Sequence, residues 1–270
     1  MNPEQVRAIL KDTFNTVASV YDNPVLRFFP ASARHLADQL HLRGHERVLD
    51  VATGTGYAAL EIADRLPSGH VMGVDFSAGM LEQARRKTAA CGVANAEFAE
   101  MDMQDLPFAE ASFDVATCAF GIFFVENMES TLAHIASKVK PGGTVAICNF
   151  QKDYFSPLRH LMIQRLAAYH IPLPPQTWER IAVESGCREL FEKAGLRDIR
   201  VEAKNMGYFL ADEEEWWNVI WNAGFRRMLS QLPPADLNRF REEHLREVAA
   251  LKTPDGLWLD VGVLYTLGTT

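Results

Sequence analysis

Short apolar runs alternate with helical segments between residues 47 and 150, and this constrains the fold of the 270-residue chain more than any other feature. Five of the runs are typical of strands: RVLDVA, HVMGVDF, AEFAEMD, DVATCAF and GTVAICNF. Nearly continuous apolar runs indicate strands buried on both faces, and intervening helices connect strands that run parallel. The pattern therefore predicts an α/β fold with a parallel sheet and helices on both of its faces.

The segments that flank this core are mostly helical. Apolar residues at helical spacing predict an amphipathic helix over 4–20 and a second helix over 30–40. After the core, the sequence predicts a helix with an irregular, proline-rich connection over 151–180. The rest is expected to contain helices over 184–194, 212–231 and 234–252, and strands over 196–204 and 257–268.

Charge and hydropathy argue against two classes of partner. The net charge is -8 and lysines and arginines form no cluster, so the electrostatic footprint of a nucleic-acid binder is missing. No run approaches the roughly 18 apolar residues that a membrane span needs. Because the N-terminal MNPEQVRAILKDTF also carries charge throughout, we expect a cytoplasmic protein with no membrane span and no targeting segment.

Neither cysteines nor histidines form a metal-binding pattern. The four cysteines are far apart and make no C-x-x-C pair, which is typical of reduced thiols. His35, His41 and His45 are close in sequence but lack a matching carboxylate pattern. We therefore expect no metal site.

A glycine-containing turn follows the first strand. Gly54 and Gly56 lie where strand passes into helix, a position where missing side chains let the backbone approach a ligand. With Ala59 the turn also satisfies the dinucleotide pattern G-x-G-x-x-A. Asp75, 19 residues after Gly56, can bind ribose hydroxyls in a dinucleotide or in an adenosyl cofactor. The turn alone leaves both cofactors open.

Three further features favour an adenosyl cofactor with a cationic end. Asp50 closes the first strand beside the turn, where a carboxylate attracts an ammonium group and repels a pyrophosphate. Asp102 follows the third strand, where it can accept a hydrogen bond from an adenine amino group. The Lys140-Pro141-Gly142-Gly143 segment makes a tight turn into the fifth strand.

Four motifs together resemble the class I S-adenosylmethionine-dependent methyltransferases. They are VLDVATGTG at 48–56, GVDFSAGMLEQAR at 73–85, MDMQDLPFAEASFDVA at 101–116 and VKPGGTVAI at 139–147. Within that family the sequence is similar to the branch of the ubiquinone/menaquinone-biosynthesis C-methyltransferases. The resemblance implies a Rossmann-like fold with a mostly parallel seven-stranded sheet and helical lid insertions.

The resemblance also implies roles for particular positions. Gly54 and Gly56 would border the methionine part of S-adenosylmethionine, with Asp50 at its ammonium end and Tyr21 over its carboxylate. Asp75 would take the ribose hydroxyls. The full set of implied cofactor-binding residues is Tyr21, Asp50, Ala52, Thr53, Gly54, Gly56, Asp75, Phe76, Met80, Asp102, Met103, Ala119 and Phe120.

The same resemblance divides the chain into parts of one methyltransferase domain over 1–270. Residues 1–40 would form an N-terminal helical cap and 41–150 the cofactor-binding core. Residues 151–270 would supply the substrate lid helices and the last two strands. At 121–127 the sequence GIFFVEN replaces a more polar stretch common in the family, so a quinone-precursor substrate does not follow from the resemblance.

Methyl transfer is an in-line displacement that chiefly requires alignment and exclusion of water. Candidates for a base after the fifth strand are Asp153, Tyr154 and His160, although lone polar residues are more often structural. Trp217 and Trp221, four residues apart, fit core packing better than ligand binding. Candidate substrate-binding residues are Phe120, Phe124, Phe150 and Tyr154.

The expected function is methyl transfer from S-adenosylmethionine to the O, N or C atom of a small-molecule acceptor, with aromatic compounds among the candidate acceptors and S-adenosylhomocysteine as product. One alternative keeps the cofactor for a non-methylating reaction, and another is an NAD-dependent oxidoreductase based on G-x-G-x-x-A. The sequence leaves open whether the protein is a monomer or a homodimer.

Overall fold

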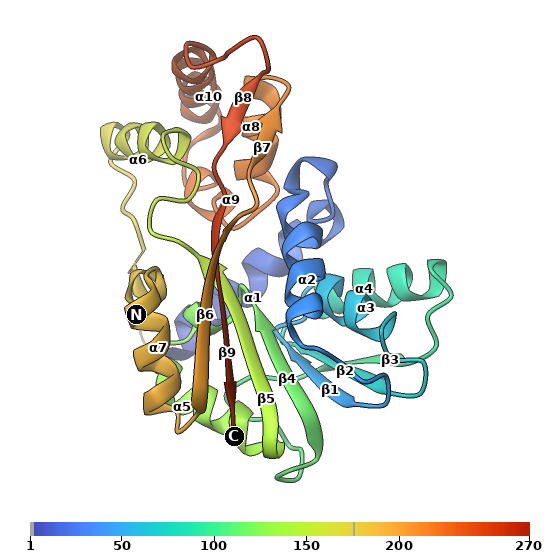
Figure 1. The fold of residues 1–270 in the computed structure, drawn as a ribbon. Helices are drawn as coiled ribbons and strands as arrows, with labels where there is room; N and C mark the ends of the chain where they lie inside the picture. The colour runs from blue at the N-terminus through green and yellow to red at the C-terminus, as the bar shows by residue number, and fades with distance from the viewer. Residues whose placement is uncertain (1–2, 175) are drawn as a thin grey trace.

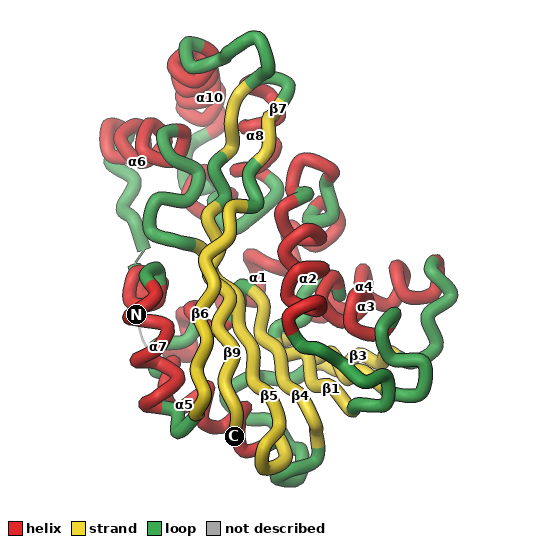
Figure 2. The backbone as a smooth tube through the Cα atoms, in the orientation of Figure 1, coloured by secondary structure: helices red, strands yellow, loops and turns green. Residues whose placement is uncertain are grey.

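A seven-stranded sheet forms the centre of the computed structural model, which describes residues 3–174 and 176–270 (Figures 1 and 2). The first five strands in sequence pair in parallel, as predicted, and β9 lies antiparallel between β5 and β6. The order across the sheet is β3 (Ala96–Glu100), β2 (His70–Asp75), β1 (Arg47–Val51), β4 (Phe113–Ala119), β5 (Val139–Phe150), β9 (Gly262–Thr269) and β6 (Arg197–Asn205).

Helices cover both faces of this sheet, which confirms the α/β prediction (Figure 1). One face carries α2 (Phe28–Gln39) and α3 (Tyr57–Ala63), and the other carries α5 (Met128–Ser137) and α7 (Glu184–Lys193). Neighbouring strand residues point to opposite faces of the sheet: Val48 packs on the face that carries α2 and α3, and Leu49 packs on the face that carries α5 and α7. Burial on both faces explains the apolar runs of the sequence.

Two groups of elements lie beyond the carboxyl ends of the parallel strands. The N-terminal helix α1 (Pro3–Val17) contacts α4 (Ala78–Ala90), which follows β2. A second layer, which we call the lid, stands at the top of Figure 1. It contains α6 (Leu158–Ala168), β7 (Tyr208–Leu210), α8 (Glu213–Trp221), α9 (Arg226–Leu229), α10 (Pro234–Ala249) and β8 (Leu257–Leu259).

The lid departs from the sequence prediction in two places. The helix expected over 212–231 is interrupted between Trp221 and Arg226, and the strand expected over 257–268 divides into β8 and β9. β8 pairs with β7, a strand that the sequence did not predict, in a separate two-stranded sheet. Gly207, just before β7, lets the two strands approach this closely, because a Cβ at this position would lie 2.6 Å from the carbonyl oxygen of Leu259 in β8.

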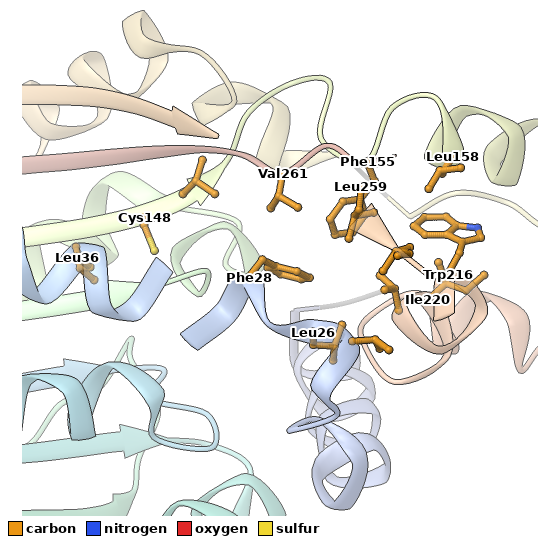
Figure 3. Packing of buried hydrophobic residues seen from close by; sticks show 14 of the residues in the cluster. Leu26, Phe28, Leu36, Cys148, Phe155, Leu158, Trp216, Ile220, Leu259 and Val261 are labelled. Atoms are coloured by element: carbon orange, nitrogen blue, oxygen red, sulfur yellow. The ribbon is translucent and has the colours of Figure 1, made fainter. Parts of the chain in front are cut away.

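Aromatic packing joins the lid to the rest of the molecule. The Phe155 ring lies between Phe28 of α2 and Trp216 of α8, with centroid distances of 5.4 and 5.9 Å (Figure 3). Trp216 is fully buried, and its indole nitrogen donates a 2.8 Å hydrogen bond to Nε2 of His244. Trp217 and Trp221 stack on each other in the lid, and neither lines the cavity described below, as the packing interpretation expected.

No helix in the described part of the chain is both long and apolar enough to cross a bilayer.

Because His244 is buried in the core of the lid, we predict that the stability of the protein depends on pH. Burial, and secondarily the positive charge of Arg165, lowers the pKa of His244 from 6.5 to about 4. Because His244 has a lower pKa in the folded protein than in the unfolded chain, its protonation favours unfolding. Its contribution to the free energy of unfolding is fully present above pH 6.5 and is lost as the pH falls toward 4. The loss amounts to roughly 3 kcal/mol at most.

We expect His244→Gln, which keeps an acceptor for Trp216, to reduce this acid-dependent loss. Urea unfolding of wild type and variant at several pH values between 7 and 4 measures the difference. Parallel stability curves for the two proteins would contradict the assignment to His244.

Candidate active site

A large cavity opens at the carboxyl edge of the parallel strands. Its volume is about 1670 Å³, and its lining comes from the ends of β1, β2, β4 and β5, from α1, and from lid residues. Small-molecule sites typically occupy about 300–1,000 Å³. The cavity therefore has room for two ligands together.

Two buried carboxylates organise the cavity wall formed by β1 and β2. Asp50 accepts hydrogen bonds from the hydroxyls of Thr53 (2.6 Å) and Thr117 (2.7 Å), and β1–β4 pairing places Thr117 directly opposite it. Burial raises the pKa of Asp50 to about 6, while the two hydroxyls oppose that rise. Asp50 is thus ionised at neutral pH.

Asp75 ties the glycine turn to the second strand. Its carboxylate accepts 2.9 Å hydrogen bonds from the backbone N–H groups of Gly54 and Ser77. Burial raises the pKa of Asp75, and these backbone bonds oppose the rise. A carboxylate has about four acceptor positions, so the two bonds leave Asp75 able to bind hydroxyl groups as well.

The two glycines of the turn differ in surroundings. Gly54 has φ +56° and lines the cavity, and a Cβ built there meets no atom within 4 Å. Gly56 has φ +85° and lies outside the lining, and its Cβ would be 3.1 Å from the Cβ of Ala84. The missing side chain of Gly56 therefore lets α4 pack closely, and contact between Gly56 and the ligand stays a prediction.

Asp102 lies beneath the N-terminal helix. Its carboxylate is 2.5 Å from Nη1 of Arg7 and accepts a 2.9 Å hydrogen bond from the N–H of Gln104. Lys11, one turn further along α1, is 2.6 Å from Glu100. These ion pairs connect α1 to the end of β3 and to the loop that follows it. The i,i+4 spacing of Arg7 and Lys11 was visible in the sequence, but nothing there indicated their partners.

Most of the residues implied by the family resemblance surround this cavity. Tyr21 stacks on Phe29 at 5.0 Å, and burial, with help from Asp75, raises the pKa of Tyr21. The sequence had not indicated Phe29. Predicted residues in the lining are Tyr21, Asp50, Ala52, Thr53, Gly54, Asp75, Phe76, Met80, Asp102, Met103, Ala119, Phe120, Phe124, Phe150 and Tyr154.

Two of the three candidate bases lie elsewhere. His160 is exposed, outside the lining, and its Nδ1 lies 3.2 Å from Oγ of Ser156. Asp153 is also exposed and outside the lining. Only Tyr154 reaches the cavity, where its ring stacks on Phe150 at 4.4 Å. Lone polar residues after a strand have no periodicity that shows their direction, so the sequence could not show which of the three candidates lines the cavity.

The histidines considered as metal ligands do not converge. His35 Nε2 lies 3.1 Å from Glu202, and its Nδ1 lies 3.1 Å from Nζ of Lys204. Within residues 3–174 and 176–270, no three His, Cys, Asp or Glu side chains are placed to hold a metal ion together.

The difference between the two glycines predicts separable effects of the same substitution. We expect Gly54→Ala to weaken binding of S-adenosylhomocysteine, the ligand implied by the resemblance, because the new methyl group points into open cavity space. Both variants place Ala at a positive φ, but Gly56→Ala should lower stability further, because its Cβ also meets the Cβ of Ala84 at 3.1 Å. Calorimetric titration and thermal unfolding of both variants test this. Equal loss of affinity in the two would contradict it.

Comparisons with known proteins agree with this geometry. Residues 48–143 match the family model described as "Methyltransferase domain". The chain is 41% identical to ubiquinone/menaquinone biosynthesis C-methyltransferase UbiE of Geotalea daltonii, over 56% of this chain and 67% of that protein. It is 34% identical to demethylmenaquinone methyltransferase of Thermus thermophilus, over 58% of this chain and 74% of that protein.

Solved structures share the fold. The YcgJ protein of Bacillus subtilis matches with a TM-score of 0.61 at 20% identity, covering 89% of this chain and 98% of that one. The [4+2]-cyclase SpnF matches with a TM-score of 0.57 at 17% identity, covering 89% and 81% of the two chains. The sequence relatives place the protein among the class I S-adenosylmethionine-dependent methyltransferases, and it belongs to their ubiquinone/menaquinone C-methyltransferase-like branch.

Proposed function

We propose that this S-adenosylmethionine-dependent methyltransferase methylates a flat aromatic small molecule that lies against the rings of Phe120, Phe150 and Tyr154. The observation that carries the proposal is that one cavity joins these rings to the carboxylates of Asp50 and Asp75. The named relatives act in ubiquinone and menaquinone biosynthesis. Aromatic acceptors are therefore the first class to test.

The carboxylates form the cofactor end of the cavity in this proposal. Asp75 would accept the ribose hydroxyls, Asp102 with Met103 would frame the adenine, and ionised Asp50 would attract the ammonium end. The donor set fits this ligand: the acidic groups match its positive charges, and the open space at Gly54 admits it close to the backbone. When bound, S-adenosylmethionine supplies a methyl group on a cationic sulfur.

The aromatic residues form the acceptor end. The Phe120 and Phe150 rings lie 4.6 Å apart, and Phe150 stacks on Tyr154 with an interplanar angle of 17°. Phe29 packs edge-on against Phe120 at 5.3 Å, and Phe14 of α1 packs against Phe124 at 5.2 Å. These rings would orient a flat acceptor and exclude water from the transfer.

Tyr154 would orient the acceptor as a hydrogen-bond donor. Burial raises its pKa, although the nearby Arg159 guanidinium opposes the rise. Tyr154 is therefore neutral at pH 7 and holds its phenolic proton. Its hydroxyl would donate to an oxygen of the acceptor, and general-base action by this group is disfavoured.

The direct test measures methyl transfer from labelled S-adenosylmethionine to a panel of phenols, hydroquinones, naphthols and aromatic acids, with aliphatic amines and alcohols beside them. The expected result is a labelled product from an aromatic acceptor, formed together with S-adenosylhomocysteine. Product from aliphatic acceptors alone would overturn the proposal.

Separate roles for Asp75 and Tyr154 follow from their places in the cavity. We expect Asp75→Ala to weaken S-adenosylhomocysteine binding by about tenfold or more, since hydrogen bonds to a charged group contribute about 1.5–3 kcal/mol. Tyr154→Phe should leave that affinity nearly unchanged and lower turnover. Calorimetry and turnover assays on both variants check the pair. Equal cofactor affinity in wild type and Asp75→Ala would refute the role of Asp75.

A further inference from the structure

The lid end of the cavity holds a buried arginine without an acidic partner. Arg159, in the first turn of α6, is 8% exposed and lines the cavity. Its Nε is buried without a hydrogen-bond partner among the described residues, and no described carboxylate forms an ion pair with it. By contrast, Arg165 in the same helix pairs with both Glu243 and Glu247.

Aromatic rings hold this guanidinium in place. Its central carbon lies 4.7 Å from the centroid of the Tyr154 ring and 4.9 Å from that of Trp178. Cation–π contacts of this kind are most favourable when the cation is desolvated. Burying a charge is costly unless that charge is paired. The rings orient Arg159 and leave its charge available to a ligand.

Buried charges of opposite sign lie at two places in the cavity lining. The carboxylates of Asp50 and Asp75 line the part formed by the strand ends, where Asp102 is paired with Arg7. The lid end carries Arg159 and the half-buried Arg227 of α9, which also forms no ion pair with a described residue. Such a distribution favours a cationic ligand at the strand ends and an anionic ligand at the lid.

The ring wall connects these two ends. Phe120 contacts Phe150, Phe150 stacks on Tyr154, and the Tyr154 ring faces Arg159. A flat acceptor lying along this row would turn one edge toward Phe120 and the opposite edge toward the guanidinium.

We propose that Arg159 binds a carboxylate of the methyl acceptor, so that the acceptor is an aromatic acid. This inference rests on the proposed function and names its substrate class. A guanidinium presents two parallel N–H donors in a plane, which match the two oxygens of a carboxylate. The unpartnered Nε supplies one of these donors. Arg159 would thereby set the direction of the ring relative to the cofactor.

Calorimetric titration with 2-naphthoate and with its uncharged counterpart 2-naphthamide tests this assignment. We expect wild-type protein to bind the acid about tenfold or more tightly than the amide. Arg159→Gln should abolish that preference. Arg159→Lys should keep part of it, because lysine carries the positive charge but lacks the two parallel N–H donors of the guanidinium. Arg246→Gln removes the same charge from an exposed position on α10 and should change nothing.

Two further measurements keep the outcomes distinct. S-Adenosylhomocysteine affinity should be unchanged in Arg159→Gln, which shows that the variant is folded. The acid and the amide are also titrated without cofactor, so that the role of Arg159 is tested independently of S-adenosylhomocysteine. If S-adenosylhomocysteine fails to bind, that result counts against the proposed function and leaves the test of Arg159 intact. Equal binding of acid and amide by wild type, an unchanged preference in Arg159→Gln, or stronger binding of 2-naphthyl phosphate than of 2-naphthoate would overturn the carboxylate assignment.

Discussion

Hydrogen bonds to two buried carboxylates hold the loop after β1, and the rest of the site depends on them. Asp50 binds the hydroxyls of Thr53 in the loop and Thr117 in β4, so it connects the loop to one neighbouring strand. Asp75 binds the N–H of Gly54 and connects the loop to the other neighbouring strand. Desolvation disfavours both charges, and these bonds compensate in part.

In the proposed function, Asp50 would select the ligand that the loop accepts. A carboxylate beside a glycine turn would repel a pyrophosphate and attract a positively charged cofactor, so an otherwise ambiguous turn would become selective. At the far end of the cavity the charge is reversed, because Arg159 is buried against rings and has no described acidic partner. Between the two ends lies an aromatic wall, so the cavity can bring donor and acceptor together while excluding water.

The sequence predicted the parts of the molecule that are governed by local pattern. The five parallel strands were predictable because burial on both faces requires apolar runs, and Asp50 and Asp75 were predictable because they end such runs. The close packing of α4 on Gly56 was not predictable, because a glycine that lets a helix approach looks the same in sequence as one that lets a ligand approach. Arg159 was missed, although its spacing from buried Met162 and Leu166 matches one helix face, since only the fold shows which arginines have acidic partners.

The measurement that tests this account most directly is thermal unfolding of the purified protein with S-adenosylhomocysteine, S-adenosylmethionine, NAD and NADP in turn. A ligand that binds only the folded state raises the unfolding temperature, by several degrees at about 100 times its dissociation constant. The account predicts a rise with the two sulfur compounds and none with the dinucleotides. A rise with NAD alone would contradict it, because the carboxylates around the loop would then not select a cationic ligand.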